Sequence, residues 1–417
     1  MSSNTHQQPT ITTTSNPVHT DKRFINKTIL ITGAGGQFGR AGALYFALRG
    51  AKVVLLDLNN DALLDTLQYV KRLVGKEQKL ERERAQELRE VQYRMLSEKL
   101  EENRRSRKNV DIKCSSTDAL LDTMTSTMSF MGNELSDKLK RTKLAMEAGV
   151  EQSMACAADT SENFQSKFKC GPIEEDPVFW KEHPGALWNK AKEYIVALQC
   201  DVTDEYAVKE CLDNAKAQFG SIDLLWNNAG YQGAIKQTLE YDPVDFGKVM
   251  QINVTGMFIV LQAAARHMAT QSKSLRQKTG RNGKFSIVNT ASVAGLRGTP
   301  AMVAYSSSKA AVLAMTVSTS KDLAPYGVRV NAVSPALIGP GYMWTRQNEL
   351  HASSGSPYFN SDPNEVARNK VNSVPMKRLG SVDEVIQTVA FLLSEESSYT
   401  TGSNLVVDGG MSAGLKA

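Results

Sequence analysis

The chain of 417 residues is 41% hydrophobic and 22% charged, which is the composition of a soluble globular protein. A net charge of +5 is modest for this length and gives no reason to expect nucleic acid as a partner. No apolar stretch approaches the ~18 residues of a membrane span, so no membrane partner is expected. The five cysteines show no C-x-x-C spacing. We therefore expect no metal site, no disulfide framework and a cytoplasmic location with reduced thiols.

The chain begins with a polar segment and continues with alternating strand and helix patterns. Residues 1–23 are rich in Ser, Thr, Asn, Gln and Pro, lack the features of a signal or transit peptide, and are predicted to be a disordered tail. Short apolar runs typical of buried strands then occur at 28–31, 52–57, 194–199, 221–226, 284–290, 327–334 and 403–408. Helical patterns between these seven runs predict an α/β fold with a doubly wound parallel sheet of the Rossmann type. Such sheets bind ligands beyond the carboxyl ends of their strands.

A long segment separates the second predicted strand from the third. Residues 76–190 form a charged insertion, and 24–75 together with 191–417 form one domain. The part 76–108 is more than half charged, and its heptad pattern is only about half filled, which favours a long solvated helix over a coiled coil. The part 110–175 has weak periodicity and is expected to be poorly ordered or loosely helical. A protein partner that binds 76–190 is an additional hypothesis.

The segment TGAGGQFG (32–39) joins the first predicted strand to a helix, and Asp57 ends the second strand about 20 residues further on. Glycines let a backbone approach a pyrophosphate, and a helix N-terminus attracts the anion. Asp57 is suited to accept hydrogen bonds from the adenosine ribose and to repel a 2′-phosphate. Leu58, rather than Arg, follows it, so the pattern favours NAD over NADP. The competing interpretation is that Asp57 caps a helix.

A second constellation combines Ser292, at the end of a predicted strand, with Tyr305 and Lys309 on the following helix. Tyr305 and Lys309 are four residues apart and share one helix face. A free tyrosine has a pKa near ~10, and a neighbouring ammonium favours the phenolate and lowers that value. The pair could therefore accept the proton of an alcohol.

These motifs, with Asp201-Val202, NNAG (227–230), Asn253, Ser334-Pro335 and TGSNLVVDGG, resemble the short-chain dehydrogenase/reductase family over 24–75 and 191–417. The resemblance implies a catalytic tetrad of Asn253, Ser292, Tyr305 and Lys309. In it the tyrosine transfers the substrate proton, the lysine also holds the nicotinamide ribose, the serine fixes the substrate oxygen and the asparagine holds a water. It also implies a cofactor site made of Gly33, Gly36, Gln37, Phe38, Gly39, Asp57, Leu58, Asp201, Val202, Asn228, Ala229, Gly230, Tyr305, Lys309, Pro335 and Ile338.

Two residues depart from the family pattern. Gln37 and Ala336 stand where the family usually has glycine. Gln37 is expected to need a backbone conformation that glycine reaches more easily, with an effect on cofactor affinity rather than identity.

The substrate is predicted from the resemblance of particular segments to one group of enzymes within the family. Segments such as GPGYMWTRQNEL resemble the bacterial xylitol dehydrogenases (D-xylulose reductases) of this family, which implies a polyol or ketose substrate. The family's substrate lid corresponds to 337–372. The substrate residues are then Ser292, Tyr305, Tyr342, Trp344 and Asn348, although Tyr342 and Trp344 could instead pack the lid. Another hydroxy or keto substrate, such as a 3-oxoacyl compound, and a scaffold role for the insertion are the alternative functions.

Small and apolar residues also mark two helices, about 245–269 and 303–323. In the resembling family the corresponding helices pair subunits into dimers and tetramers. We therefore expect a homotetramer.

Overall fold

The computed structural model describes residues 23–107 and 194–413. The predictions for the tail, apart from Arg23, and for 108–190 lie outside these residues. The chain forms two compact units. One comprises 1–79 and 188–417, and the other comprises 80–187. The candidate site lies in the first unit, which is described below.

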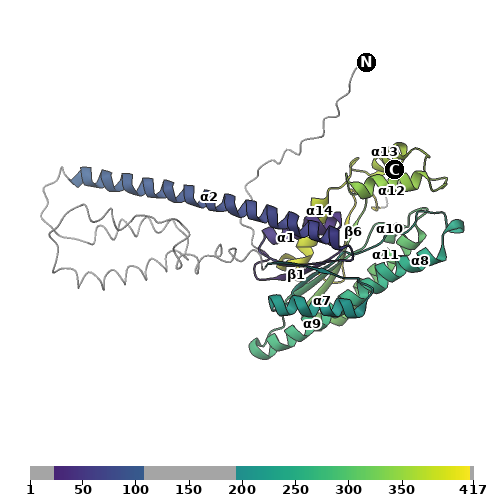
Figure 1. Ribbon diagram of the computed structural model, residues 1–417, viewed down its shortest axis with the longest axis horizontal. Coiled ribbons are helices and arrows are strands. Elements are labelled where there is room, and N and C mark those ends of the chain that lie inside the picture. The colour runs from purple at the N-terminus through teal and green to yellow at the C-terminus, as the bar shows by residue number, and fades with distance from the viewer. Residues whose placement is uncertain (1–22, 108–193, 414–417) are drawn as a thin grey trace, which may run out of the picture. The chain divides into compact units, whose positions relative to one another are not determined.

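All seven predicted strands are present and form one parallel sheet in the order β3-β2-β1-β4-β5-β6-β7 (Figure 1), so the predicted fold is confirmed. Each apolar run lies inside the sheet with helices on both faces, which explains why the strands are apolar rather than alternating. The strands are β1 (Thr28–Thr32), β2 (Lys52–Asp57), β3 (Ile195–Gln199), β4 (Leu224–Asn227), β5 (Phe285–Thr290), β6 (Val328–Pro335) and β7 (Asn404–Val407).

The helices follow the strands in the doubly wound pattern. They are α1 (Gln37–Leu48), α2 (Asn60–Arg107), α7 (Glu205–Phe219), α8 (Pro243–Met250), α9 (Met257–Thr279), α10 (Ala294–Arg297), α11 (Val303–Leu323), α12 (Tyr342–Ala352), α13 (Pro363–Ser373) and α14 (Val382–Leu393). A π-helical turn, η4 (Gln251–Gly256), joins α8 to α9, and short 3₁₀ turns lie at η3 (Thr238–Glu240), η5 (Ala324–Tyr326) and η6 (Glu395–Ser397).

Two hydrophobic cores cover the two faces of the sheet. One combines α1, the start of α2 and α14, and its largest buried side chains include Trp226 and Phe46. The other combines α7 and α9, with Leu212, Leu261 and Met268 buried against the sheet. Figure 1 shows α1 and α14 on one side of the strands, with α7 and α9 on the other. Together these cores fix the sheet whose carboxyl edge carries the site.

The apolar segment Pro243–Thr279, which includes α9, is long and apolar enough by composition to cross a membrane, with a mean hydropathy of 1.3 in its best window. By length and composition, the expectation that no apolar stretch approaches a membrane span was therefore wrong. In the structure Val260, Leu261, Ala264 and Met268 of α9 are buried against the sheet. Burial of this kind is expected of a core helix that packs on a sheet.

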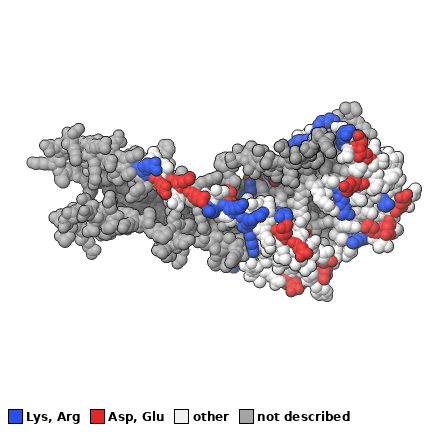
Figure 2. Space-filling view, turned by 45° about the horizontal axis from the view of Figure 1, so that its top comes forward, with Lys and Arg blue, Asp and Glu red and all other residues white. Residues whose placement is uncertain are grey.

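Helix α2 is continuous through Arg107, so the helical part of the charged segment agrees with the sequence prediction. Among its described side chains, the buried ones, such as Leu63, Val70 and Val74, lie within 60–74. Leu80, Val91 and Met95 further along are exposed. On the face in Figure 2 basic and acidic residues are interspersed, in keeping with 49 basic and 44 acidic residues in the whole chain.

Candidate active site

The candidate site lies where the parallel strands end. Asp57 is the last residue of β2, Ser292 follows β5 and Pro335 ends β6. Because these strands run parallel, their carboxyl ends meet at one edge of the sheet. The backbone confirms this proximity, since Val293 N donates to Pro335 O at 3.1 Å.

Tyr305 and Lys309 lie on the first turns of α11, as the sequence predicts. The Lys309 ammonium is 5.6 Å from the centre of the Tyr305 ring and donates to Thr290 O at 2.7 Å. Lys309 is only 3% exposed, and burial lowers its pKa to about 8. Burial also raises the pKa of Tyr305, and a hydrogen bond with Ser292 opposes part of that rise. The ammonium donates to a backbone carbonyl here and burial is the largest influence on the pKa of Tyr305, so the lowering expected from Lys309 stays a prediction.

Ser292 faces the same space as Tyr305. Its hydroxyl accepts from Ala294 N at 3.1 Å, which fixes its position at the start of α10. Ser292 and Tyr305 both line a cavity of about 520 Å³, and its wall is completed by residues of the α12–α13 segment such as His351, Phe359 and Lys370. A substrate oxygen placed between the two hydroxyls would meet both.

Asn253 is fully buried within η4, so its amide groups must find partners inside the protein. Its Nδ2 donates to Tyr231 O at 2.8 Å and to Ser308 Oγ at 3.0 Å, and its Oδ1 accepts from Tyr231 N at 2.7 Å. Ser308 in turn donates to Tyr305 O. Asn253 thus contacts the backbone around Tyr305 through Ser308, with both N–H groups already used.

The glycine loop allows two very close backbone approaches. Gly33 has φ +65°, and a Cβ there would lie 2.9 Å from Ala229 Cα. A Cβ at Gly39 would overlap the carbonyl oxygen of Gly33. Gly36 is the N-cap of α1 and no side chain caps that helix, while Phe38 packs against the core below. The start of α1 therefore leaves backbone N–H groups for a ligand anion.

Gln37 does not have the unusual backbone that the sequence analysis expected. It is the first residue of α1, and the non-glycine residues with positive φ in the described chain are Asn26, Ala301 and Lys377. Helical φ and ψ are open to any residue, so the expectation of strain was wrong. The Gln37 side chain instead donates to Pro340 O at 3.3 Å, across to the segment after β6. Ala336 likewise has no positive φ and lines the large cavity.

Asp57 contacts the glycine loop directly. Its Oδ2 accepts from Gly35 N at 2.8 Å and its Oδ1 from Asn59 N at 2.8 Å. The cap of α2 is Asn59, whose Oδ1 accepts from Ala62 N. The alternative interpretation of Asp57 as the helix cap is therefore not supported. Leu58 beside it is 62% exposed.

The remaining cofactor candidates surround this loop. Thr32 Oγ1 accepts from Asn228 N and Ala229 N at 2.8 and 2.9 Å, which ties NNAG to β1. A Cβ at Gly230 would lie 3.6 Å from Lys309 Nζ. Asp201 accepts from the backbone and hydroxyl of Thr203, and Val202 packs against Gly256. Ile338 pairs with Gly380 and packs against the core.

Three substrate candidates are not among the residues that line the large cavity: Tyr342, Trp344 and Asn348. Tyr342 is 73% exposed, and Trp344 packs near Gly339. Asn348 is buried and accepts a hydrogen bond from Lys370 Nζ at 2.7 Å. Of the five predicted substrate residues, the structure therefore brings Ser292 and Tyr305 together.

Sequence reasoning missed His351 and Lys370, which do line the cavity. They lie on α12 and α13, and no motif marks either residue. The spacing of Asn348 and His351, three residues apart on one helix, was the available signal. Their meeting with Lys370 depends on how the two helices pack.

Comparison with known proteins agrees with this arrangement. The model of the enoyl-(acyl carrier protein) reductase family matches residues 181–412, more than half of the chain. Levodione reductase of Leifsonia aquatica is 32% identical over 52% of this chain and 75% of its own length. L-2,3-butanediol dehydrogenase of Corynebacterium glutamicum is 35% identical over 54% of this chain and 81% of its own length. The solved structure of NAD⁺-bound xylitol dehydrogenase is 33% identical, with a TM-score of 0.60 over 93% of this chain and all of that one.

The sheet order, the glycine loop and these matches define the class of protein: the chain belongs to the short-chain dehydrogenase/reductase family. It is an oxidoreductase of the class that interconverts secondary alcohols and ketones with a nicotinamide dinucleotide.

Proposed function

We propose that this protein is an NAD-dependent polyol dehydrogenase that oxidises xylitol to D-xylulose. The observation that carries the proposal is the single cavity in which Ser292 and Tyr305 meet, with Lys309 one helical turn further along α11. Xylitol dehydrogenase with bound NAD⁺ is similar to this chain over its whole length, which supports the choice of polyol.

The residues of the glycine loop fit a dinucleotide. Gly33 and Gly39 allow a backbone approach that any Cβ would block, and the uncapped start of α1 suits a pyrophosphate. Asp57 suits the adenosine ribose, and Leu58 next to it brings no cation for a 2′-phosphate. The cofactor is NAD(H), in agreement with the relatives. When bound, NAD⁺ supplies the acceptor for the hydride.

In the proposed reaction a secondary alcohol and NAD⁺ give a ketone, NADH and one proton. Ser292 holds the substrate oxygen, and Tyr305 takes the hydroxyl proton as the carbinol C–H bond breaks. Because burial raises the pKa of Tyr305, the nearby positive charge of Lys309 is needed to favour its phenolate during turnover. In the reverse direction Tyr305 returns the proton to the ketone oxygen.

A substrate panel tests this proposal. Purified protein with NAD⁺ is offered xylitol, other five- and six-carbon polyols, 2,3-butanediol and simple secondary alcohols, and NADH absorbance gives kcat/KM. Among these neutral alcohols, the proposal predicts that xylitol, or a close stereoisomer, has the highest value and that D-xylulose is the product. A clear preference for 2,3-butanediol would replace the polyol with a smaller diol, since a dehydrogenase of that diol is also similar. No turnover with any alcohol would favour the scaffold alternative.

A further inference from the structure

The large cavity has an unbalanced charge. The charged side chains among the described residues that line it are Arg297 and Lys370, and no lining residue is Asp or Glu. Arg297 donates to the backbone carbonyl of Met411 and is exposed to water. Lys370 is the less exposed of the two and lies on the α13 side of the cavity.

Lys370 has neutral partners. Its ammonium donates to Asn348 Oδ1 at 2.7 Å, lies 3.0 Å from His351 Nδ1, and lies 5.5 and 5.9 Å from the rings of Trp344 and Phe359. Within residues 23–107 and 194–413, no carboxylate forms an ion pair with it. Burial without a counter-charge lowers the pKa of Lys370 to about 8. One of its three N–H groups is left for a further acceptor.

His351 supplies a second unmatched polar group in the same wall. It is 1% exposed, and burial, with the Lys370 charge beside it, lowers its pKa to about 4, so the ring is neutral at physiological pH. Nδ1 lies between Gln347 O and Lys370 Nζ, but Nε2 is buried with no partner among the described residues. Because a carbonyl oxygen can only accept, the 2.7 Å contact with Gln347 O places the single ring proton on Nδ1 and leaves Nε2 with a lone pair.

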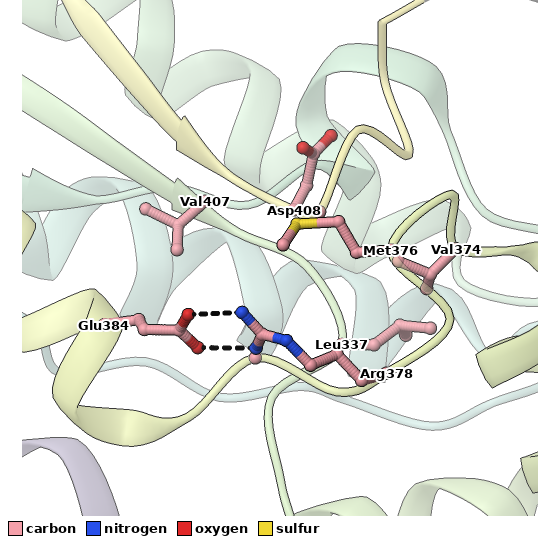
Figure 3. Close-up of a pocket in the computed structure, with 9 residues that line it drawn as sticks. Leu337, Val374, Met376, Arg378, Glu384, Val407 and Asp408 are labelled. Atoms are coloured by element: carbon pink, nitrogen blue, oxygen red, sulfur yellow. Dashed lines mark hydrogen bonds and ion pairs between the residues drawn. The ribbon is translucent and has the colours of Figure 1, made fainter.

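A smaller cavity of about 50 Å³ nearby shows the contrasting case (Figure 3). There Arg378 faces Glu384 and donates two hydrogen bonds to its carboxylate, at 2.8 and 3.0 Å. Its cation is therefore balanced within the protein. Lys370 has no such carboxylate, and a desolvated ammonium is stabilised more by an anion than by a neutral hydroxyl.

We propose that Lys370 forms an anion-binding subsite of the substrate cavity, so that the alcohol oxidised at Tyr305 carries a carboxylate or a phosphate. This inference rests on the proposed function, because it assigns a substrate class to the same cavity. It deepens that function by making the polyol an acidic one. Lys370 would then select the substrate, while Ser292 and Tyr305 act on its hydroxyl.

The test compares substrates with the same five-carbon skeleton. Xylitol, D-xylonate and xylitol 5-phosphate are offered with NAD⁺ to the wild-type protein and to Lys370→Gln, Lys370→Arg and Lys278→Gln. The glutamine in Lys370→Gln carries no charge but still has N–H groups. It can therefore replace the hydrogen bond from Lys370 to Asn348 that links α13 to α12. Lys278, an exposed residue on α9, is the matched control for loss of one positive charge.

The wild-type protein is expected to have at least a ~10-fold higher kcat/KM for one of the two anions than for xylitol. Lys370→Gln should raise KM for that anion about 10- to 100-fold, the range of a charge-assisted hydrogen bond, with KM for xylitol within about 3-fold. Lys370→Arg should retain most of the preference. The compound whose KM rises in Lys370→Gln shows whether the subsite binds a carboxylate or a phosphate.

Two results would overturn the subsite. One is a wild-type preference for neutral xylitol, and the other is an equal rise of KM for all three compounds in Lys370→Gln, which would make Lys370 a structural link between α12 and α13. If no compound is oxidised, the proposed function fails. The subsite is then tested separately, by calorimetry of D-xylonate and xylitol 5-phosphate with the NADH complex. Binding that Lys370→Gln weakens supports the subsite, whereas binding that is absent or unchanged rejects it.

Discussion

Asp57 and Asn59 are close in the sequence but have different roles in the structure. Asn59 caps α2, and Asp57 is left to hold the backbone of Gly35 and to face the space beside the glycine loop. A carboxylate in this position accepts two ribose hydroxyls but repels a phosphate on the same sugar. The choice between NAD and NADP therefore depends on Asp57 and on the residue that follows it.

Exchanging these two residues should change the cofactor. The double change Asp57→Ser with Leu58→Arg removes the repelling charge and adds a cation for the 2′-phosphate, so kcat/KM should shift from NAD toward NADP. Steady-state kinetics with both cofactors measures the shift. Equal use of NAD and NADP by the wild-type protein would contradict the role given to Asp57.

Tyr305→Phe removes only the phenolic oxygen. Turnover should fall by about 10²- to 10⁴-fold, the usual contribution of a general acid or base, while NADH affinity stays within a few-fold. Turnover and NADH fluorescence titration measure the two effects. Tyr342→Phe, on an exposed residue, is the matched control and should change neither. Robust turnover in Tyr305→Phe would mean that another group transfers the proton.

Burial of Lys309 predicts a pH-dependent stability. Its pKa is about 8 in the folded protein and ~10.4 when unfolded, so between these values the unfolded chain binds more protons and stability rises with pH. Lys309→Met removes this titration, and the Lys370 contribution cancels in the comparison. From about pH 7 to about pH 10, the wild-type free energy of unfolding should gain about 2–3 kcal/mol relative to the variant. Urea unfolding measures it, and a pH-independent difference would exclude a buried, charged Lys309.

Some residue assignments could be made from the sequence because a motif fixes both position and chemistry. Ser292 and Tyr305 are of this kind, and they share a cavity. The backbone conformation of Gln37 could not be predicted in this way, because its helical φ and ψ depend on where α1 begins. His351 and Lys370 escaped notice because their contact joins two helices, and no local pattern encodes it.

Strands were the most predictable elements, because each buried strand leaves an unbroken apolar run such as that of β2. The α12–α13 segment was harder to interpret. Its aromatic residues suggested substrate contacts, yet Tyr342 is exposed and Asn348 is occupied by Lys370. Which face of a short amphipathic helix meets the cavity depends on its tertiary packing.

The chain enters β3 at the amino end of that strand, opposite to the carboxyl ends at which the candidate site lies. It enters β3 at Ile195, the amino end of an edge strand, whereas Asp57 and Ser292 lie at carboxyl ends. Among the described side chains of α2, Val74 is the last that is buried. A large excursion at such a point costs little, because loop-closure entropy grows only with the logarithm of length.

Replacing about 78–188 with a short Gly/Ser linker should therefore leave a folded enzyme. Turnover and KM are expected to stay within a few-fold of the full chain, whereas binding of a protein partner, if the insertion has one, would be lost. Circular dichroism, NADH binding and steady-state kinetics measure these properties. A soluble variant that binds NADH but has lost turnover would show that the insertion contributes to the site.

Assembly of whole subunits is expected to involve α9 and α11. Of the small residues marked in the sequence, Gly256, Ala264 and Ala304 pack inside the subunit. Two others of that set, Ala310 and Ala314, lie with Val317 on one exposed face of α11, and Phe258 on α9 is 41% exposed. An apolar face of this kind suits a partner subunit.

Light scattering should give the mass of a homotetramer at micromolar concentration. Val317→Asp places a charge in the expected interface and should yield dimers or monomers, whereas Tyr206→Asp, on an exposed residue of α7, should not. A wild-type monomer would contradict the assembly.

Direct hydride transfer is the central claim for the molecule as a whole, and isotopic labelling tests it most directly. Xylitol carrying deuterium on its carbinol carbons is incubated with NAD⁺ and the protein, and the reduced cofactor is analysed by mass spectrometry. The account predicts one deuterium per NADH formed, with D-xylulose as the other product and almost no signal from Tyr305→Phe. Unlabelled NADH, or no reduced cofactor from a protein that binds NADH, would contradict it.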